Sequence, residues 1–333
     1  MITVVLYERR DCHLCGQAKD ELINLQSIYP HELVEIDVDS DEDLQRAYGS
    51  EVPIIQVGPY RIKPPFTNQE IKMTLGAATD RKNQLEAFND PLYLEKVNRG
   101  KNWSRTDAIT YWFARHYLLV FNLFVFVYVG FSFLAPILMR SGATTPAKII
   151  YRVYGTVCHQ LAFRSFFLFG EQTVYPRRAA GWENLKSFQE ATGLSEDNNP
   201  VNLYNAHQFV GNSIVGYKAA LCQRDVSIYL AILLFGLIYP AINRRLPALP
   251  WFVWVVFGLI PIGLDGVSQL LSQPPFSFLP YRESTPLLRI LTGGLFGFTT
   301  AWFGYPLVEI TMAESRKILA AKYIRLKGSK EDR

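Results

Sequence analysis

The residues near the N-terminus whose spacing could support chemistry are Cys12 and Cys15, a C-x-x-C pair. They follow the apolar segment 2–6, which predicts a strand, and they open a segment to about Ile28 that predicts a helix. The free N–H groups and positive dipole end of a helix start stabilise a cysteine thiolate. The pair therefore indicates thiol–disulfide exchange. His13, inside the motif, either supports the thiolate by charge or hydrogen bonding or is an exposed side chain with little effect.

The segments that follow predict a small α/β domain around this motif. Further strands are expected at 33–37, 54–57 and 61–63, with helices at 41–48 and from Asn68. A C-x-x-C beside a βαβ pattern is typical of a thioredoxin-like redox domain. Structural zinc is the rival interpretation, but it normally needs four ligands, and this segment has no second C-x-x-C or H-x₃-H.

The run Cys12-His13-Leu14-Cys15, together with Val52-Pro53, resembles the glutaredoxin-like branch of the thioredoxin superfamily over about residues 1–78. The resemblance implies that Cys12 is the nucleophile and that Cys15 resolves the mixed disulfide. It also implies that Pro53 has a cis peptide bond and leaves neighbouring backbone free to pair with an extended substrate. The Gly-rich turn and acidic helix start of glutathione-using members are replaced here by Lys63-Pro64-Pro65-Phe66, which argues against glutathione and favours a protein dithiol or disulfide partner.

Long apolar segments dominate the chain from Tyr117 onward, and about 20 such residues can cross a bilayer. The expected spans are Tyr117–Met139, Val226–Ile242, Trp251–Leu271 and Leu287–Ile310. The stretch Ile149–Gly170 is apolar but interrupted by Arg152, His159 and Arg164, so we expect an interfacial or re-entrant helix there. The expected fold class is thus an α/β thioredoxin-like domain followed by an α-helical polytopic membrane domain.

Basic residues in short loops set the expected orientation of the spans. They precede the first span, lie between the second and third, and follow the fourth, which predicts a multi-pass plasma-membrane protein with both termini in the cytoplasm. The expected parts are a glutaredoxin-like domain (1–79), a cytoplasmic amphipathic linker (80–110), a membrane domain (111–312) with a large outer loop (140–225), and a basic cytoplasmic tail (313–333). The net charge of +4 fits basic loops at membrane edges. The bilayer is therefore an expected partner, and nucleic acid is not.

The cysteines outside the N-terminal domain are Cys158 and Cys222, both on the predicted outer face. The sequence leaves four interpretations open: a structural disulfide, a metal site, a redox pair that exchanges electrons with a quinone or a thiol protein, or free thiols. A metal site would add His159 and either His207 or Asp265. Mixed thiolate and imidazole ligands suit zinc or copper.

Polar residues at membrane depth are costly and are expected to pair or to line a path. The expected network consists of Arg164, Arg224, Asp225, Asp265, Gln269, Glu283 and Arg289. It could be structural or could form a substrate or ion path, and an Asp265–Arg289 ion pair would fit helices of opposite direction. Gly293-x-x-x-Gly297 predicts close helix packing.

The polar motifs of the membrane domain occur in a fixed order along residues 150–300. They are C-H-Q and R-S, then C-x-R-D before a span, then D-G-x-x-Q, then E-S with R-x-x-T-G. This order resembles a family of predicted bacterial membrane proteins without an assigned activity. The resemblance implies a membrane location but no mechanism.

The leading hypothesis is a membrane-anchored thiol–disulfide oxidoreductase in which Cys12 attacks and Cys15 resolves. The membrane domain would localise the reaction or couple it to Cys158 and Cys222. The alternative is a transporter or metal-handling protein whose glutaredoxin-like domain is a redox sensor or delivery module. In a third reading the N-terminal domain is an inert docking module.

Overall fold

The computed structural model describes residues 1–88, 91–100 and 102–331, and the chain divides into two compact units. The first unit comprises Met1–His116 and Ile310–Arg333, and the second comprises Tyr117–Glu309. The division falls inside two long helices, α5 (Arg105–Arg140) and α12 (Pro286–Glu331). Each of these two helices therefore contributes residues to both units.

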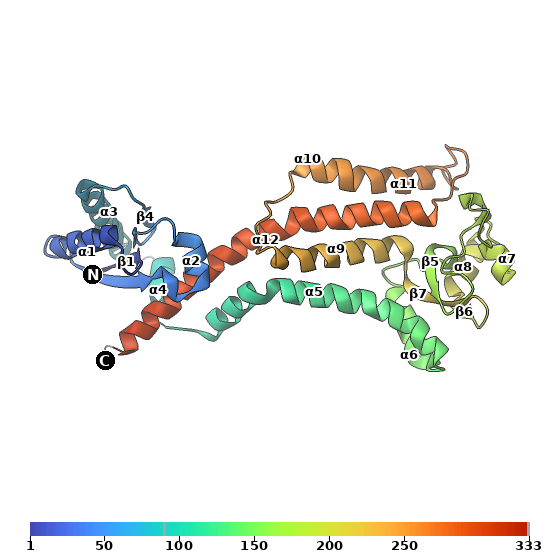
Figure 1. Cartoon of the computed structure of the whole chain (residues 1–333), viewed down its shortest axis with the longest axis horizontal. Helices are drawn as coiled ribbons and strands as arrows, with labels where there is room; N and C mark the ends of the chain where they lie inside the picture. Colours follow the sequence, from blue (N-terminus) through green and yellow to red (C-terminus); the bar gives the residue numbers. More distant parts are fainter. Residues whose placement is uncertain (89–90, 101, 332–333) are drawn as a thin grey trace. The chain divides into compact units, whose positions relative to one another are not determined.

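A four-stranded sheet organises the first unit. The strands are β1 (Ile2–Glu8), β2 (His31–Asp37), β3 (Ile54–Val57) and β4 (Tyr60–Ile62). Their order is β2-β1-β3-β4, with β1 and β2 parallel and the other neighbours antiparallel. This mixed sheet with a helix between β1 and β2 confirms the expected thioredoxin-like fold (Figure 1).

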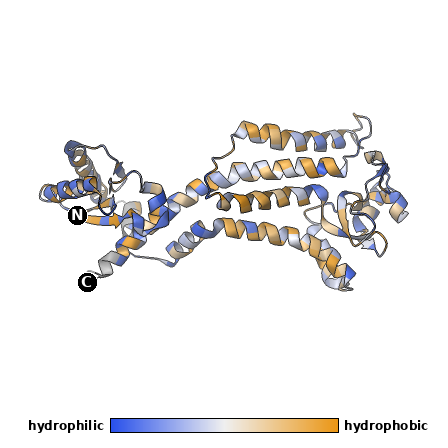
Figure 2. Ribbon diagram, in the orientation of Figure 1, coloured by the Kyte–Doolittle hydropathy of each residue, from blue (hydrophilic) through white to orange (hydrophobic). Residues whose placement is uncertain are grey.

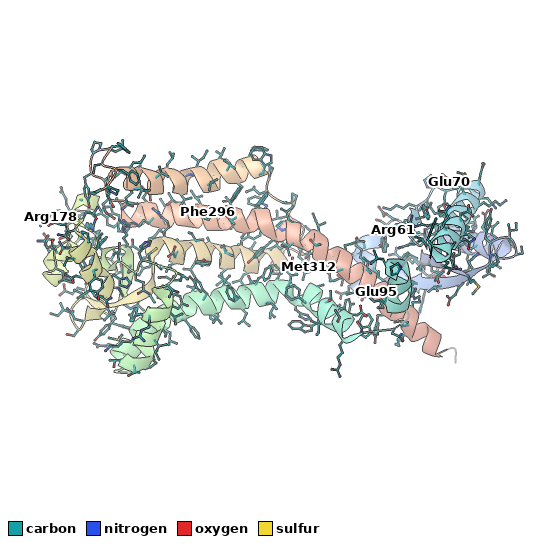
Figure 3. The ribbon with its side chains drawn as sticks, turned by 180° about the vertical axis from the view of Figure 1, so that it is seen from behind. Arg61, Glu70, Glu95, Arg178, Phe296 and Met312 are labelled. Atoms are coloured by element: carbon teal, nitrogen blue, oxygen red, sulfur yellow. A yellow bond between two sulfur atoms is a disulfide. The ribbon has the colours of Figure 1, made fainter. Side chains whose placement is uncertain are left out.

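Helices α1 (His13–Leu25) and α3 (Asn68–Ala87) cover one face of this sheet. Alternate residues of a strand point to one face, so Val4 and Leu6 of β1 pack with Leu22 of α1 and Leu75 of α3, all fully buried. The start of α3 is fixed by a capping box between Thr67 and Glu70, which Figure 3 labels. These contacts hold α1, and with it the C-x-x-C motif, against β1.

The opposite face of the sheet is covered by α2 (Glu42–Tyr48) and by the last part of α12. Ala320 of α12 is 2% exposed and packs in the same core as Ile36 and Leu44. Arg316 donates to Asp43 (2.9 Å) and to the carbonyl oxygen of Ala114 (2.9 Å). The residues expected as a basic tail, 313–333, are thus helical to Glu331 and help to complete the sheet domain.

The segment expected as a linker, 80–110, is largely helical where it is described. Helix α3 continues to Ala87, α4 spans Pro91–Gly100, and α5 begins at Arg105. Asn89, Asp90 and Lys101 lie outside the described residues.

Three helices in the described part of the chain are long and apolar enough to cross a membrane: α5, α9 (Gln223–Ala241) and the continuous helix Trp251–Leu271. The third consists of α10 (Trp251–Trp254), a π-helical turn (Val255–Leu259) and α11 (Ile260–Leu271). Apolar residues run along all three helices in Figure 2. The fourth expected span, Leu287–Ile310, lies in α12 and is not among these three, since Arg289 and several Gly and Thr residues lower its hydropathy. It stays a prediction.

Small residues let the helices of the second unit approach closely. A Cβ at Gly293 would lie 2.8 Å from the carbonyl oxygen of Arg224, and one at Gly297 would overlap that of Ile228. The G-x-x-x-G pair of α12 therefore packs against α9, and these helices run side by side in Figure 1.

The expectation of a helix over Ile149–Gly170 is wrong. Helix α6 (Thr144–Tyr154) covers only the start of this stretch. A 3₁₀ turn (Ala162–Arg164) and strand β5 (Ser165–Leu168) follow it. In β5 the buried residues alternate, with Ser165 and Phe167 inside, so the local pattern is that of a strand.

Residues 141–222, which we name the sheet module, lie in the segment expected as the large outer loop between spans and form short strands and helices; their position outside the membrane stays a prediction. Strand β5 pairs with β7 (Gly216–Cys222), and β7 pairs with β6 (Gly211–Asn212). Helices α7 (Phe188–Thr192) and α8 (Pro200–Gln208) complete the module. Its core includes the aromatic side chains of Phe163, Phe167 and Phe188.

Because α12 completes the second face of the sheet, Ala320→Glu should lower the free energy of unfolding of the first unit by at least about 2 kcal/mol, since it buries a charge without a partner. Thermal unfolding of the purified full chain in detergent would measure this. Ile318→Glu is the matched control, because Ile318 is 58% exposed on the same helix. Equal melting temperatures for the two variants would contradict the packing of α12 on the sheet.

Candidate functional site

The first sulfur site is a disulfide between Cys12 and Cys15 at the N-terminus of α1. Cys12 is the N-cap residue, and its Sγ accepts a hydrogen bond from the backbone N–H of Cys15 (3.2 Å). Cys15 is 2% exposed, whereas Cys12 is partly exposed. The two sulfurs therefore differ in access, and the accessible one lies at the positive end of a helix.

The loop that carries Cys12 is held at the end of β1. Arg9 forms a two-pronged ion pair with Asp39, just beyond β2 (2.7 and 2.9 Å). The Arg9 hydrogen bonds hold the pKa of Asp39 below its usual range. His13, the first residue of α1, is exposed.

Pro53 lies at the same end of the sheet as this loop. The Val52–Pro53 peptide bond is cis, as the glutaredoxin resemblance implies. Pro53 directly precedes Ile54, which pairs with Tyr7 at the end of β1. The topology thus brings the proline and the C-x-x-C motif to the same end of the sheet.

The second sulfur site joins Cys158, Cys222 and Asp225. The two sulfurs and a carboxylate oxygen of Asp225 all lie within 4.8 Å of one another, and the two cysteines are not disulfide-bonded. Hydrogen bonding to Cys222 and burial raise the pKa of Cys158, and the same hydrogen bond lowers the pKa of Cys222. Cys222 is therefore the thiol that loses its proton first.

The histidines expected beside these cysteines lie elsewhere. His159 is exposed, and its carbonyl oxygen accepts a hydrogen bond from Nδ1 of His207 (2.8 Å). Asp265 belongs to a separate ionic network with Arg224. Among the described residues, Asp225 alone adds a potential metal ligand to those of Cys158 and Cys222.

Lys218 on β7 is a buried ammonium group that the sequence did not single out. Its side chain is fully buried and donates to the carbonyl oxygens of Gln160 (2.7 Å) and His207 (2.6 Å). Burial lowers the pKa of Lys218 to about 7. Two neutral acceptors thus offset only part of the cost of burying this charge.

The polar network of the second unit centres on Glu283, whose side chain is 1% exposed. Three arginines contact its carboxylate: Arg164 (3.0 Å), Arg177 (3.2 Å) and Arg289. Gln269 also donates to it (2.8 Å). Burial acts to raise the pKa of Glu283, but the charges of Arg164 and Arg289 together hold it below its usual range.

A second carboxylate, Asp265, is held next to this group. It pairs with Arg224 and with Arg282 (2.8 Å), and it accepts a hydrogen bond from Ser284 (2.7 Å). The Asp265–Arg289 ion pair that the sequence left possible does not form, because Arg289 contacts Glu283 in the loop before α12.

Some members of this network were not predicted from the sequence, and one predicted member, Asp225, lies elsewhere. Arg177, Arg282 and Ser284 belong to it, and Asp225 belongs instead with the cysteines. Arg177 and Arg178 are adjacent, yet Arg177 is 2% exposed and Arg178, labelled in Figure 3, is exposed. No sequence signal distinguishes the buried arginine from its neighbour, since only the fold of the sheet module decides it.

The first unit is thus a thioredoxin-like domain with a pair of cysteines at a helix start, joined in one chain to helices long and apolar enough to cross a membrane. Residues 3–76 match the family "Glutaredoxin-like domain (DUF836)", and residues 207–303 match "Predicted membrane protein (DUF2085)". The chain is therefore a glutaredoxin-like domain followed by a predicted membrane protein domain, which confirms the expected fusion.

One curated relative shares part of the chain. It is the "Uncharacterized protein MJ1492" of Methanocaldococcus jannaschii, 27% identical over 202 residues, which cover 58% of this chain and 92% of the relative. No solved structure matches the chain.

Removing the charge of Glu283 should destabilise the second unit strongly. Glu283→Gln leaves the buried Arg177 and Arg289 without their counter-charge, which should lower the free energy of unfolding by about 3–5 kcal/mol. Thermal unfolding in detergent would measure it, with Glu183→Gln, an exposed site, as the control. A variant as stable as the control would refute the central role of Glu283.

Lys218 should make stability depend on pH. Its folded pKa lies near 7 and its unfolded pKa near 10.4, so between these values the unfolded chain binds more protons. The free energy of unfolding should then rise from pH 7 to 10 by up to about 1.4 kcal/mol per pH unit, whereas below that window Lys218 adds nothing to the slope and its destabilising effect is fully present. Lys218→Met should remove this rise in denaturant titrations across that pH range. The exposed control Lys148→Met should keep it, and equal slopes in both variants would refute the assignment.

Proposed function

We propose that this chain is a membrane-anchored thiol–disulfide oxidoreductase that acts through Cys12 and Cys15. The observation that carries the proposal is the arrangement of the two sulfurs: Cys12 is partly exposed at the start of α1, and it is bonded to the buried Cys15. This is the arrangement that an attacking and a resolving cysteine need.

The reaction follows from this difference in access. The Cys12 thiolate attacks one sulfur of a substrate disulfide, forms a mixed disulfide and releases the first substrate thiolate. The Cys15 thiolate then attacks the Cys12 sulfur, and the second substrate thiolate leaves. Cys12 and Cys15 have now lost two electrons and form the disulfide seen in the structure. An external dithiol reductant returns the pair to its reduced state.

Two features favour a protein substrate. Pro53 lies at the same end of the sheet as Cys12, so the backbone just before β3 is positioned to pair with an extended chain. After β4 the chain continues through Lys63-Pro64-Pro65-Phe66, where glutathione-using relatives have a Gly-rich turn and an acidic helix start. The spanning helices would localise this reaction at the plasma membrane, with both termini in the cytoplasm.

The expected alternative, a transporter or metal-handling protein, draws its support from a different place. It rests on the second sulfur site rather than on the dithiol, so the two hypotheses concern separate residues.

Substitution of each cysteine separates the two chemical roles. In the full chain in detergent, Cys12→Ser should lower insulin reduction by dithiothreitol to the rate without protein. Pre-reduced Cys15→Ser, mixed with insulin after dithiothreitol has been removed, should accumulate a covalent adduct with an insulin chain, visible on a non-reducing gel, because the resolving thiol is gone.

The double variant Cys158→Ser/Cys222→Ser is the control and should reduce insulin at the wild-type rate. Retained turnover in Cys12→Ser would refute the proposal. An adduct in Cys12→Ser rather than in Cys15→Ser would reverse the two roles.

A further inference from the structure

The second sulfur site brings together one donor that follows α6 and two donors at the start of α9. Cys158 follows α6, Cys222 ends β7 and caps α9, and Asp225 lies in the first turn of α9. The three potential ligand atoms lie within 4.8 Å of one another. These atoms form one set of potential metal ligands, and none of them takes part in the reaction proposed for Cys12 and Cys15.

The start of α9 repeats the local geometry of the start of α1, with one change. In each helix a cysteine is the N-cap residue, and the residue three positions later donates its backbone N–H to the cysteine sulfur, at 3.2 Å for Cys15 and 3.5 Å for Asp225. At α1 that residue is a second thiol, which can close a disulfide. At α9 it is a carboxylate, which cannot take part in disulfide exchange but can bind a cation.

The distances suit a small metal ion. In a tetrahedral zinc site, with Zn–S bonds of about 2.3 Å and Zn–O bonds of about 2.0 Å, the ligand atoms lie about 3.5–3.8 Å apart. Side-chain rotations that close the group by about 1 Å would reach this geometry.

The surroundings also suit a metal ion. Cys158 is 7% exposed and packs with Tyr154, Leu221 and Val226, so the first ligand lies in an apolar core. Arg224, next to Asp225, turns to Asp265 and leaves the Asp225 carboxylate to the cysteines. An apolar shell around thiolate ligands strengthens the interaction with a cation.

We propose that Cys158, Cys222 and Asp225 bind a thiophilic divalent cation of the zinc type and leave its fourth coordination position open. Two thiolates select a soft or borderline metal, and the carboxylate favours a dication over a monovalent ion. Three protein ligands with an open position are typical of sites that exchange a ligand rather than of closed structural sites.

The test uses the full chain in the Cys12→Ser/Cys15→Ser background, so that neither N-terminal sulfur can bind metal. After reduction and dialysis against buffered Zn²⁺, elemental analysis should find about one zinc per chain. Cys158→Ser and Cys222→Ser should each remove it, and Asp225→Asn should weaken binding at least tenfold, which is about 1.4 kcal/mol. His159→Gln, which alters an exposed neighbour, should bind zinc as before.

Co²⁺ provides a readout that does not depend on the folding of the variants. The reduced background protein should show the thiolate-to-cobalt charge-transfer absorption, and Zn²⁺ should displace it. Absence of this absorption, zinc that persists in the Cys158→Ser/Cys222→Ser protein, or loss of zinc in His159→Gln would each overturn the proposal. A Cys158–Cys222 disulfide that dithiothreitol does not reduce would overturn it as well. Because Cys12 and Cys15 are absent from this protein, none of these results bears on the oxidoreductase proposal.

Discussion

The second unit depends on one buried carboxylate, Glu283, and on the arginines that keep it charged. A carboxylate out of water is stable as an anion only when charges and hydrogen bonds surround it. Here the guanidinium groups come from a 3₁₀ turn (Arg164), from the body of the sheet module (Arg177) and from the first turn of α12 (Arg289). One side chain thereby joins two parts of the sheet module to the start of α12, which lies more than 100 residues later in the sequence.

This constraint explains how the sheet module is fixed to the helix ends of its own unit. The module has its own aromatic core, but its position against the helix ends depends on directional contacts of Arg164 and Arg177 to Glu283, in the loop between α11 and α12. Apolar contacts between helices are tolerant of small shifts, whereas paired guanidinium and carboxylate groups are not. The ends of α9 and α12 are therefore held in one register, in which Gly293 and Gly297 meet α9.

The elements that could be predicted from the sequence are those whose signal is local. The strand–C-x-x-C–helix order of residues 2–25 and the long apolar helices have such signals, and the glutaredoxin-like fold was confirmed on them. In the sheet module short strands and helices alternate within an apolar stretch, so helical and strand periods could not be separated, and the helix expected at 149–170 was wrong.

Partners within the polar clusters could not be predicted for a different reason. Residue type identifies Arg289 and Asp265 as costly in a membrane domain, but the choice of partner depends on a few ångströms of loop path around Glu283. Likewise Asp225 was assigned to the ionic network, because its place in the first turn of α9, facing Cys222, shows only in three dimensions. The sequence thus identifies which side chains are chemically important, but not which of them contact one another.

The use of α12 to cover the sheet has a consequence for the order of synthesis. Residues of the first unit leave the ribosome both before and after the second unit, because all of the second unit lies between them in the chain. The face of the sheet that packs on α1 and α3 can be buried as soon as these helices are made. The core on the other face, which includes Ile36 and Leu44, is complete only when Ala320 of α12 has been made. The sheet domain, whose first residues are made before the second unit, is thus completed only after the second unit has been made, and until then one apolar face of its sheet stays exposed.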